Sequence, residues 1–127
     1  MDAEIALARQ ILDLPEHAPL VFNDVGWTSR VYLYARGELV VKFPRDEAVK
    51  QEYALECAAY RLMKQADLAS LASVCLPELR AVGTDFAYLA YAGVVGQTLD
   101  QQIKTRALDD TQKKRLGQHI GLFLKQL

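Results

Sequence analysis

The chain has 127 residues, which suits one domain with a single core. About half of it (51%) is apolar, 24% is charged, and the formal net charge is −1. This balance excludes the electrostatic signature of nucleic-acid or anionic-membrane binding. The apolar runs fall far short of the roughly 20 residues that a membrane-spanning helix needs. The N-terminus carries Asp2 and Glu4 and has no basic stretch before an apolar one, so no signal peptide is expected.

The two cysteines, Cys57 and Cys75, both lie among apolar residues. We expect two buried thiols rather than a disulfide, because a buried free cysteine behaves as a small apolar side chain. A reducing cytoplasm is the simplest compartment for such a chain.

The first predicted element is a short amphipathic helix. It covers residues 3–13, with Asp2 as a candidate N-cap and Pro15 after its end. Helical spacing places four apolar side chains on one face: Ile5, Ala8, Ile11 and Leu12.

Strands are predicted next. The segment VFNDVGWTS begins with a brief apolar run at Val21 and breaks at residues 23–26. Segments 31–34 (VYLY) and 39–43 (LVVKF) are rich in β-branched and aromatic residues. Gly37 lies between them and is free to adopt a positive φ, so these two segments predict a β-hairpin.

A long helix and two further strands follow. Pro44 ends the second hairpin strand, and Asp46 is a candidate cap for a helix over about 47–66, which lacks glycine and proline. A short strand is predicted at 79–82. Segment 86–92 (FAYLAYA) is apolar throughout, which predicts a central strand.

The last part of the chain is predicted to be helical. Glycines at 93 and 96 break the preceding strand, and Thr98 is a candidate cap for a helix over 99–104. Asp109 and Asp110 open a final helix over about 110–126. Its apolar stripe consists of Leu116, Ile120, Phe123 and Leu124. The strands cluster in hairpins without alternating helices, so the predicted class is α+β with a five-stranded, mostly antiparallel sheet.

Lys42 is the most informative residue, because it interrupts an apolar strand. Alternation places Val40 and Lys42 on one face, and Val41 and Phe43 on the other. A lysine between apolar neighbours needs a counter-charge when it is buried. The alternative is a lysine whose ammonium reaches solvent from an exposed hairpin face.

The order of loop, hairpin, lysine, helix, two strands and glycine hinge resembles the N-terminal lobe of the protein-kinase-like fold. It is most similar to the aminoglycoside phosphotransferase family. The resemblance covers about residues 20–127. It rests on segments 26–34 (GWTSRVYLY), 40–45 (VVKFPR) and 91–99 (YAGVVGQTL).

The resemblance implies a nucleotide-binding role for Lys42. In this family the lysine contacts the α- and β-phosphates of ATP or GTP and pairs with a glutamate of the following helix. Glu56 is favoured over Glu52 as that partner, because it precedes an apolar helix segment as in family members. Residues 1–97 would then form the nucleotide-binding lobe with its hinge, and residues 98–127 the helical start of a second lobe.

Two further segments acquire expected roles from the resemblance. The phosphate-covering loop corresponds to residues 24–29, in which Gly26, Thr28 and Ser29 would offer backbone N–H groups and hydroxyls. A full G-x-G-x-x-G is absent, so the loop taken alone also fits an ordinary turn.

The hinge would hold the purine base through main-chain groups. The Ala92 carbonyl and the Val94 N–H are the expected contacts. Val40, Leu89 and Tyr91 would wall the pocket, although each also suits a core.

The family's catalytic groups are expected outside these residues. They are an aspartate base in a His-x-Asp loop, a nearby asparagine and a second aspartate for magnesium. No His-x-Asp occurs in the sequence, so no catalytic residue is assigned and this chain alone is not expected to transfer phosphate. The Mg²⁺ ligands and the small-molecule acceptor site would belong to the second lobe. The sequence does not assign the acceptor substrate, for which aminoglycosides, choline, homoserine, sugars and macrolides all remain candidates.

The chain's partners follow from the same comparison. An apolar stripe left bare on the last helices would favour self-association. Two alternatives remain open: a kinase-like interaction module that binds no nucleotide, and an unrelated α+β binding domain with Lys42 on its surface.

Overall fold

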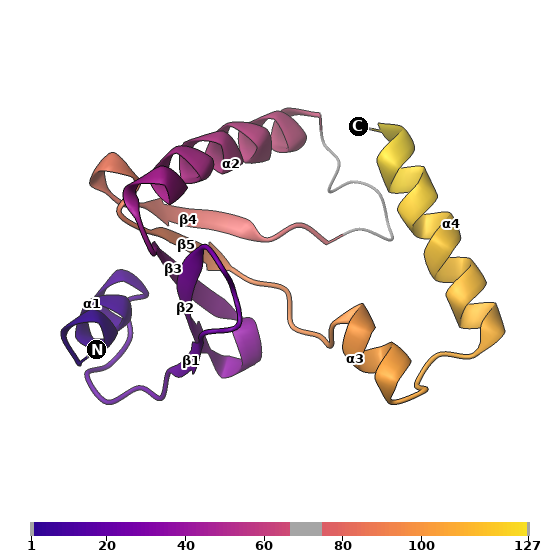
Figure 1. Ribbon diagram of the computed structural model, residues 1–127, viewed down its shortest axis with the longest axis horizontal. Coiled ribbons are helices and arrows are strands. Elements are labelled where there is room, and N and C mark those ends of the chain that lie inside the picture. Colours follow the sequence, from indigo (N-terminus) through magenta and orange to yellow (C-terminus); the bar gives the residue numbers. More distant parts are fainter. Residues whose placement is uncertain (1, 67–74, 127) are drawn as a thin grey trace. The chain divides into compact units, whose positions relative to one another are not determined.

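The computed structural model describes residues 2–66 and 75–126. The chain divides into two compact units: Met1–Tyr60 with Leu76–Val95 form the first, and the remainder forms the second. The predicted boundary after residue 97 remains a prediction. The first unit contains the sheet in Figure 1, and the last residues of α2, from Arg61, belong to the second. The elements up to the end of the sheet are α1 (Asp2–Ile11), β1 (Val21–Asn23), β2 (Ser29–Tyr34), β3 (Leu39–Pro44), α2 (Glu47–Gln65), β4 (Glu78–Val82) and β5 (Leu89–Ala92).

The sheet has five strands in the order β1-β2-β3-β5-β4, and every pair of neighbours is antiparallel. The predicted α+β class and the five-stranded sheet are therefore confirmed. β3 lies at the centre, between its hairpin partner β2 and the later strand β5. This position places Lys42 in the middle of the sheet.

Each face of the sheet is covered by one helix. The face toward α1 buries Tyr32, Val41, Phe43 and Ala90, together with Ala8 of the helix. Apolar contacts of this kind contribute roughly 25 cal/mol for each Å² removed from water.

The opposite face packs against α2. Leu89 and Tyr91 are buried there against the side chains Val49, Tyr53 and Cys57 of the helix. Lys42 pairs with Leu89 in the β3–β5 register. Directly opposed residues of an antiparallel pair share a face, so Lys42 lies on the side of α2.

Glu4 anchors α1 to its face of the sheet. The Arg30 guanidinium donates to both carboxylate oxygens of Glu4, with Nη2 and Oε2 2.9 Å apart, and the Tyr32 hydroxyl donates at 3.0 Å. The hydrogen bond from Arg30 lowers the pKa of Glu4, against the opposing effect of burial. Burial, together with Glu4, raises the pKa of Tyr32 to about 12.

The hairpin turn and the first residue after β5 are in close contact. Gly37 adopts φ +98°, as expected. The Gly93 N–H donates to the Glu38 carbonyl at 2.9 Å. A Cβ on Gly93 would lie 2.1 Å from the Gly37 carbonyl oxygen. Glycine is thus required at 93 for a close backbone approach.

Several of the expected element boundaries are wrong. The helix expected to reach residue 13 ends at Ile11, and the strand expected from residue 31 begins at Ser29. The strand expected from residue 86 begins at Leu89, because Thr84–Phe86 forms a 3-10 turn in which Asp85 and Phe86 have φ of 55° and 54°. Asp2 lies inside the first turn of α1 rather than before it.

The caps of later helices are confirmed. The Asp46 carboxylate accepts from the Val49 N–H at 3.1 Å. In the second unit, Thr98 and Gln101 form a capping box at the start of α3 (Leu99–Lys104).

The second unit carries a small, open apolar pocket. α4 (Asp110–Gln126) follows α3. Their side chains surround a pocket of about 240 Å³, lined by Leu99, Ile103, Leu108, Lys113, Leu116, Gly117 and Ile120. Ile120 and Leu124 of the predicted stripe are exposed, whereas Leu116 and Phe123 are partly covered.

The prediction for the cysteines is half wrong. Neither forms a disulfide, and Cys57 is buried on the sheet-facing side of α2, but Cys75 is exposed. Cys75 lies in the irregular segment before β4. None of the described helices combines the length and the apolar character needed to cross a bilayer.

Candidate functional site

The Lys42–Glu56 ion pair is the centre of the candidate site. Lys42 Nζ donates to Glu56 Oε2 at 2.5 Å. The side chain of Lys42 is 20% exposed and that of Glu56 41%. β3 delivers the lysine from the sheet and α2 delivers the glutamate from above it, so the pair joins the two elements. The predicted partner is Glu56, and Glu52 is exposed on the helix.

Two tyrosines surround this ion pair. The Tyr91 hydroxyl donates to Glu56 Oε1 at 2.7 Å. The Lys42 ammonium lies 4.8 Å from the centre of the Tyr53 ring and 5.8 Å from that of Tyr91, within the range of cation–π attraction. The sequence analysis placed Tyr91 in the wall of the expected purine pocket, and it gave Tyr53 no role.

The phenol groups remain protonated at neutral pH. Burial raises the pKa of Tyr91, and the Glu56 carboxylate raises it further. Burial also raises the pKa of Tyr53, against the opposing hydrogen bond with Ser29. Both hydroxyls therefore keep the proton that a hydrogen-bond donor needs.

Ser29 connects the end of the β1–β2 loop to α2. Its side chain is 5% exposed, and its Oγ lies 2.6 Å from the Tyr53 hydroxyl. The hydroxyl is thus already engaged within the fold. Thr28 and Gly26 are exposed and can present their backbone and the Thr28 hydroxyl to solvent.

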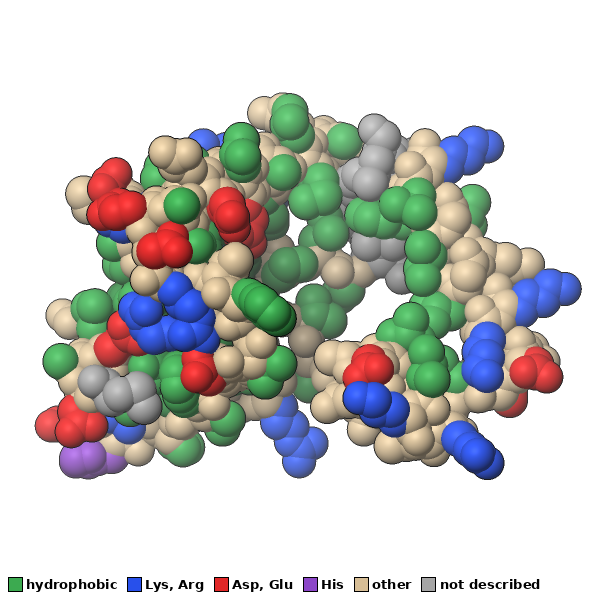
Figure 2. Space-filling model, in the orientation of Figure 1, with side chains coloured by type: hydrophobic (Ala, Val, Ile, Leu, Met, Phe, Trp, Pro, Cys, Tyr) green, Lys and Arg blue, Asp and Glu red, His purple; other side chains and the backbone are tan. Residues whose placement is uncertain are grey.

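Arg45 holds this loop against the end of β3. Its side chain pairs with the Asp24 carboxylate and donates to the Gly26 carbonyl at 3.1 Å, while its backbone N–H donates to the Thr28 carbonyl at 2.9 Å. Figure 2 shows acidic and basic side chains in close proximity over the sheet unit, in line with such pairs. Trp27, at the tip of the loop, is 95% exposed.

The expected wall and hinge residues lie in different environments. Val40 is partly buried and packs against the α2 core, beside Tyr91 in the β3–β5 register. Leu89 is completely buried beneath α2. Ala92 ends β5, and Val94 beyond it is exposed. Lys42, Glu56, Val40 and Tyr91 are thus brought together, with Leu89 behind them.

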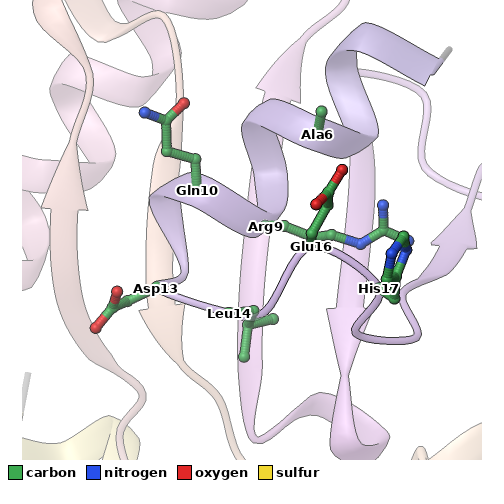
Figure 3. Close-up of a pocket in the computed structure, with 7 residues that line it drawn as sticks. All are labelled: Ala6, Arg9, Gln10, Asp13, Leu14, Glu16 and His17. Atoms are coloured by element: carbon green, nitrogen blue, oxygen red, sulfur yellow. The ribbon is translucent and has the colours of Figure 1, made fainter.

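A concave surface lies on α1, away from this site. The pocket of about 540 Å³ drawn in Figure 3 is lined by Ala6, Arg9, Gln10, Asp13, Leu14, Glu16 and His17. Arg9 and His17 point toward each other in that view, and Arg9 Nε donates to the Ala18 carbonyl at 2.9 Å. α1 covers the sheet face opposite Lys42, so this pocket is separate from the ion pair.

Within residues 2–66 and 75–126, no three His, Cys, Asp or Glu side chains are grouped so that they could hold a metal ion.

Comparison with known proteins now places the chain. The family model described as the phosphotransferase enzyme family matches residues 20–127. The chain belongs to this family. The resemblance noted in the sequence is therefore confirmed, and α1 precedes the matched region.

A solved structure shares the fold of this phosphotransferase-family chain. It is the ternary complex of APH(2″)-IIa with streptomycin and ATP, at 23% identity and a TM-score of 0.72. The match covers 100% of the present chain and 40% of the other, so the chain spans well under half of that protein. No curated protein matches the chain in sequence.

Proposed function

We propose that this chain is the nucleotide-binding lobe of a small-molecule phosphotransferase, with Lys42 contacting the phosphates of ATP or GTP. The observation that carries the proposal is the Lys42–Glu56 pair, which holds a partly exposed ammonium on the α2 side of the central strand β3. Membership of the phosphotransferase family supports this function, and the solved structure with the same fold is a complex with ATP.

Each part of the proposed site supplies a different contact. The Lys42 ammonium is a compact charge suited to a phosphate oxygen. Backbone N–H groups of residues 26–28 would approach the same phosphates, since Arg45 holds that loop in place. The Ala92 carbonyl and the Val94 N–H would hold the base beside Val40.

The remaining machinery is proposed to lie beyond these residues. A catalytic base, magnesium ligands and the acceptor site would come from a second lobe, of which residues 98–127 form the helical start. Alone, this chain would bind nucleotide and transfer no phosphate. A cytoplasmic location is supported by two cysteines that form no disulfide.

Nucleotide titration with a matched pair of lysine variants tests the proposal. Lys42 and Lys50 each form an ion pair with an α2 glutamate, Glu56 and Glu47 respectively. A ligand present at a hundred times its dissociation constant stabilises a protein by about 2.7 kcal/mol. We expect Mg-ATP or Mg-GTP to raise the melting temperature of the wild type and of Lys50→Ala, but not of Lys42→Ala.

The outcomes separate the hypotheses. Equal stabilisation of both variants by nucleotide would show that Lys42 does not contribute to nucleotide binding. A lack of stabilisation by either nucleotide, in this chain and in one extended by a second lobe, would favour the interaction module.

We also propose self-association through the second unit. Its apolar side chains Ile103, Ile120, Leu122 and Leu124 are each about half exposed or more. Burying such a surface would favour a dimer. Light scattering at high micromolar concentration should give more than the monomer mass of 14.2 kDa, and a clean monomer would contradict the proposal.

A further inference from the structure

We infer that Tyr91 is a positioning residue, whose hydroxyl fixes the Glu56 carboxylate in the orientation that holds the Lys42 ammonium. The relevance of this orientation to nucleotide binding rests on the proposed function. The arrangement itself does not, because it concerns contacts within the folded chain.

The two oxygens of Glu56 have different partners. Oε2 accepts from Lys42 and Oε1 accepts from Tyr91. The second bond restrains rotation of the carboxylate about its terminal torsion, which is broad when nothing restrains it. The glutamate is therefore held in one plane from two neighbouring strands, β3 and β5.

Such a restraint is needed because the ion pair is only partly covered. The Glu56 side chain is 41% exposed. Solvent-exposed ion pairs contribute little, typically about 0–1 kcal/mol, because their long side chains lose entropy and water screens the charges. Lys42 alone would thus leave the glutamate free to turn toward solvent for much of the time.

Tyr91 is well suited to hold it, because its own position is fixed. Its side chain is 8% exposed and packs with Val49, Tyr53, Cys57 and Leu89. It lies on β5, which pairs on both edges. A hydroxyl on a packed ring with two side-chain torsions loses little freedom when it binds, which is the basis of preorganisation.

Tyr53 completes the surroundings of the lysine. Its ring centre is 4.8 Å from the ammonium, and Ser29 holds its hydroxyl at 2.6 Å. The ammonium thus touches a carboxylate and an aromatic face, each of which is anchored by a further hydrogen bond. Lysine has three N–H donors, and Glu56 takes one of them, so a phosphate oxygen can approach without breaking the pair.

The first experiment needs no nucleotide. The ¹⁵Nζ signal of Lys42 is observed by NMR in the wild type, in Tyr91→Phe and in the control Tyr88→Phe. Tyr88 is matched because it also lies in the sheet unit, but it packs in the α1 core. We expect the ammonium signal to weaken through faster proton exchange in Tyr91→Phe and to be unchanged in Tyr88→Phe. An unchanged signal in Tyr91→Phe would overturn the inference.

A reciprocal measurement leaves Tyr91 in place and covers the case in which Tyr91→Phe does not fold. In Glu56→Gln the charge of the acceptor is lost while the size of the side chain is kept. The hydroxyl proton of Tyr91, observed with ring-labelled tyrosine, should exchange faster with water than in the wild type. Identical exchange rates would show that the hydroxyl does not depend on Glu56 and would contradict the inference.

The second experiment connects the arrangement to binding through a double-mutant cycle. Loss of one hydrogen bond should weaken the affinity of Tyr91→Phe for nucleotide by roughly 3- to 10-fold. If Tyr91 acts through Glu56, the double variant with Glu56→Gln should bind no more weakly than Glu56→Gln alone. Additive losses would show that the Tyr91 hydroxyl acts independently of Glu56 and would overturn the inference. A wild type that binds no nucleotide would sink the proposed function, and the NMR comparison would still decide the role of Tyr91.

Discussion

The close approach of Gly93 to the hairpin turn gives a sharp prediction for Gly93→Ala. The added Cβ would lie 2.1 Å from the Gly37 carbonyl oxygen and 3.0 Å from Val40 Cγ2. The first of these neighbours is backbone, so no rotamer change relieves the clash and the turn or the hinge must shift. Overpacking of this kind costs typically about 1–3 kcal/mol.

A smaller term opposes this loss. Replacing glycine by alanine restricts the unfolded chain and contributes about 0.4–1 kcal/mol of stability where the native backbone tolerates it. Gly93 does not have a positive φ, so this term applies. We expect the free energy of unfolding to fall by about 1.3 kcal/mol, the difference between the midpoints of the two ranges. The Gly93 N–H bond to Glu38 should weaken as well.

Urea denaturation followed by circular dichroism measures this change. Gly96→Ala is the matched control, because Gly96 is three residues along the chain, and within the described residues its added Cβ would meet no atom within 4 Å apart from its chain neighbours. The control should retain or slightly exceed the wild-type stability. Faster hydrogen exchange of the residue 93 amide in Gly93→Ala would locate the effect. If Gly93→Ala were as stable as Gly96→Ala, the argument from the backbone approach would be refuted.

Two further predictions concern a carboxylate and the thiols. The pKa of Glu4 is lowered in the folded chain, so its contribution to stability is complete above the ordinary value of 4.5 and is lost as the pH falls through the folded value. Glu4→Gln should therefore destabilise the chain at pH 7 and much less at pH 3. The control Glu16→Gln, at an exposed position, should leave the stability unchanged at both pH values. An equal loss of stability for Glu4→Gln at both pH values would contradict the role of the ion pair with Arg30. A thiol reagent should label the exposed Cys75 quickly and the buried Cys57 only on unfolding, and mass spectrometry showing equal labelling rates in the folded chain would contradict the buried position of Cys57.

Local patterns were sufficient for only one half of the ion pair at the centre of the site. Strand alternation placed Lys42 on the face opposite to Val41 and Phe43, because the period of a strand fixes this. Helix periodicity alone did not separate Glu56 from Glu52, and the choice of Glu56 came from the resemblance to the family. The caps at Asp46 and Thr98 were predictable from residue type and position.

Contacts between distant segments were not predictable. Arg45 pairs with Asp24 across 21 residues of sequence, and the Ser29 hydroxyl reaches Tyr53 across 24. No periodicity links such residues, because their proximity depends on how β2, β3 and α2 pack. The positive φ of Phe86 was also not predictable, because its apolar side chain suggested an extended strand.

The register of the central strands determines both the core and the site. Val40 pairs with Tyr91 and Lys42 with Leu89, so the four side chains face α2 together. A slip of one residue would turn Lys42 toward the α1 core, among Tyr32 and Phe43, because strand side chains alternate between faces. That arrangement would bury an ammonium without a carboxylate, at a cost that is large for an isolated charge. The charge on Lys42 therefore disfavours the wrong register, and the apolar partners on either side of it favour the right one. The same lysine that the proposed function requires thus also helps to specify the sheet on which the site is built.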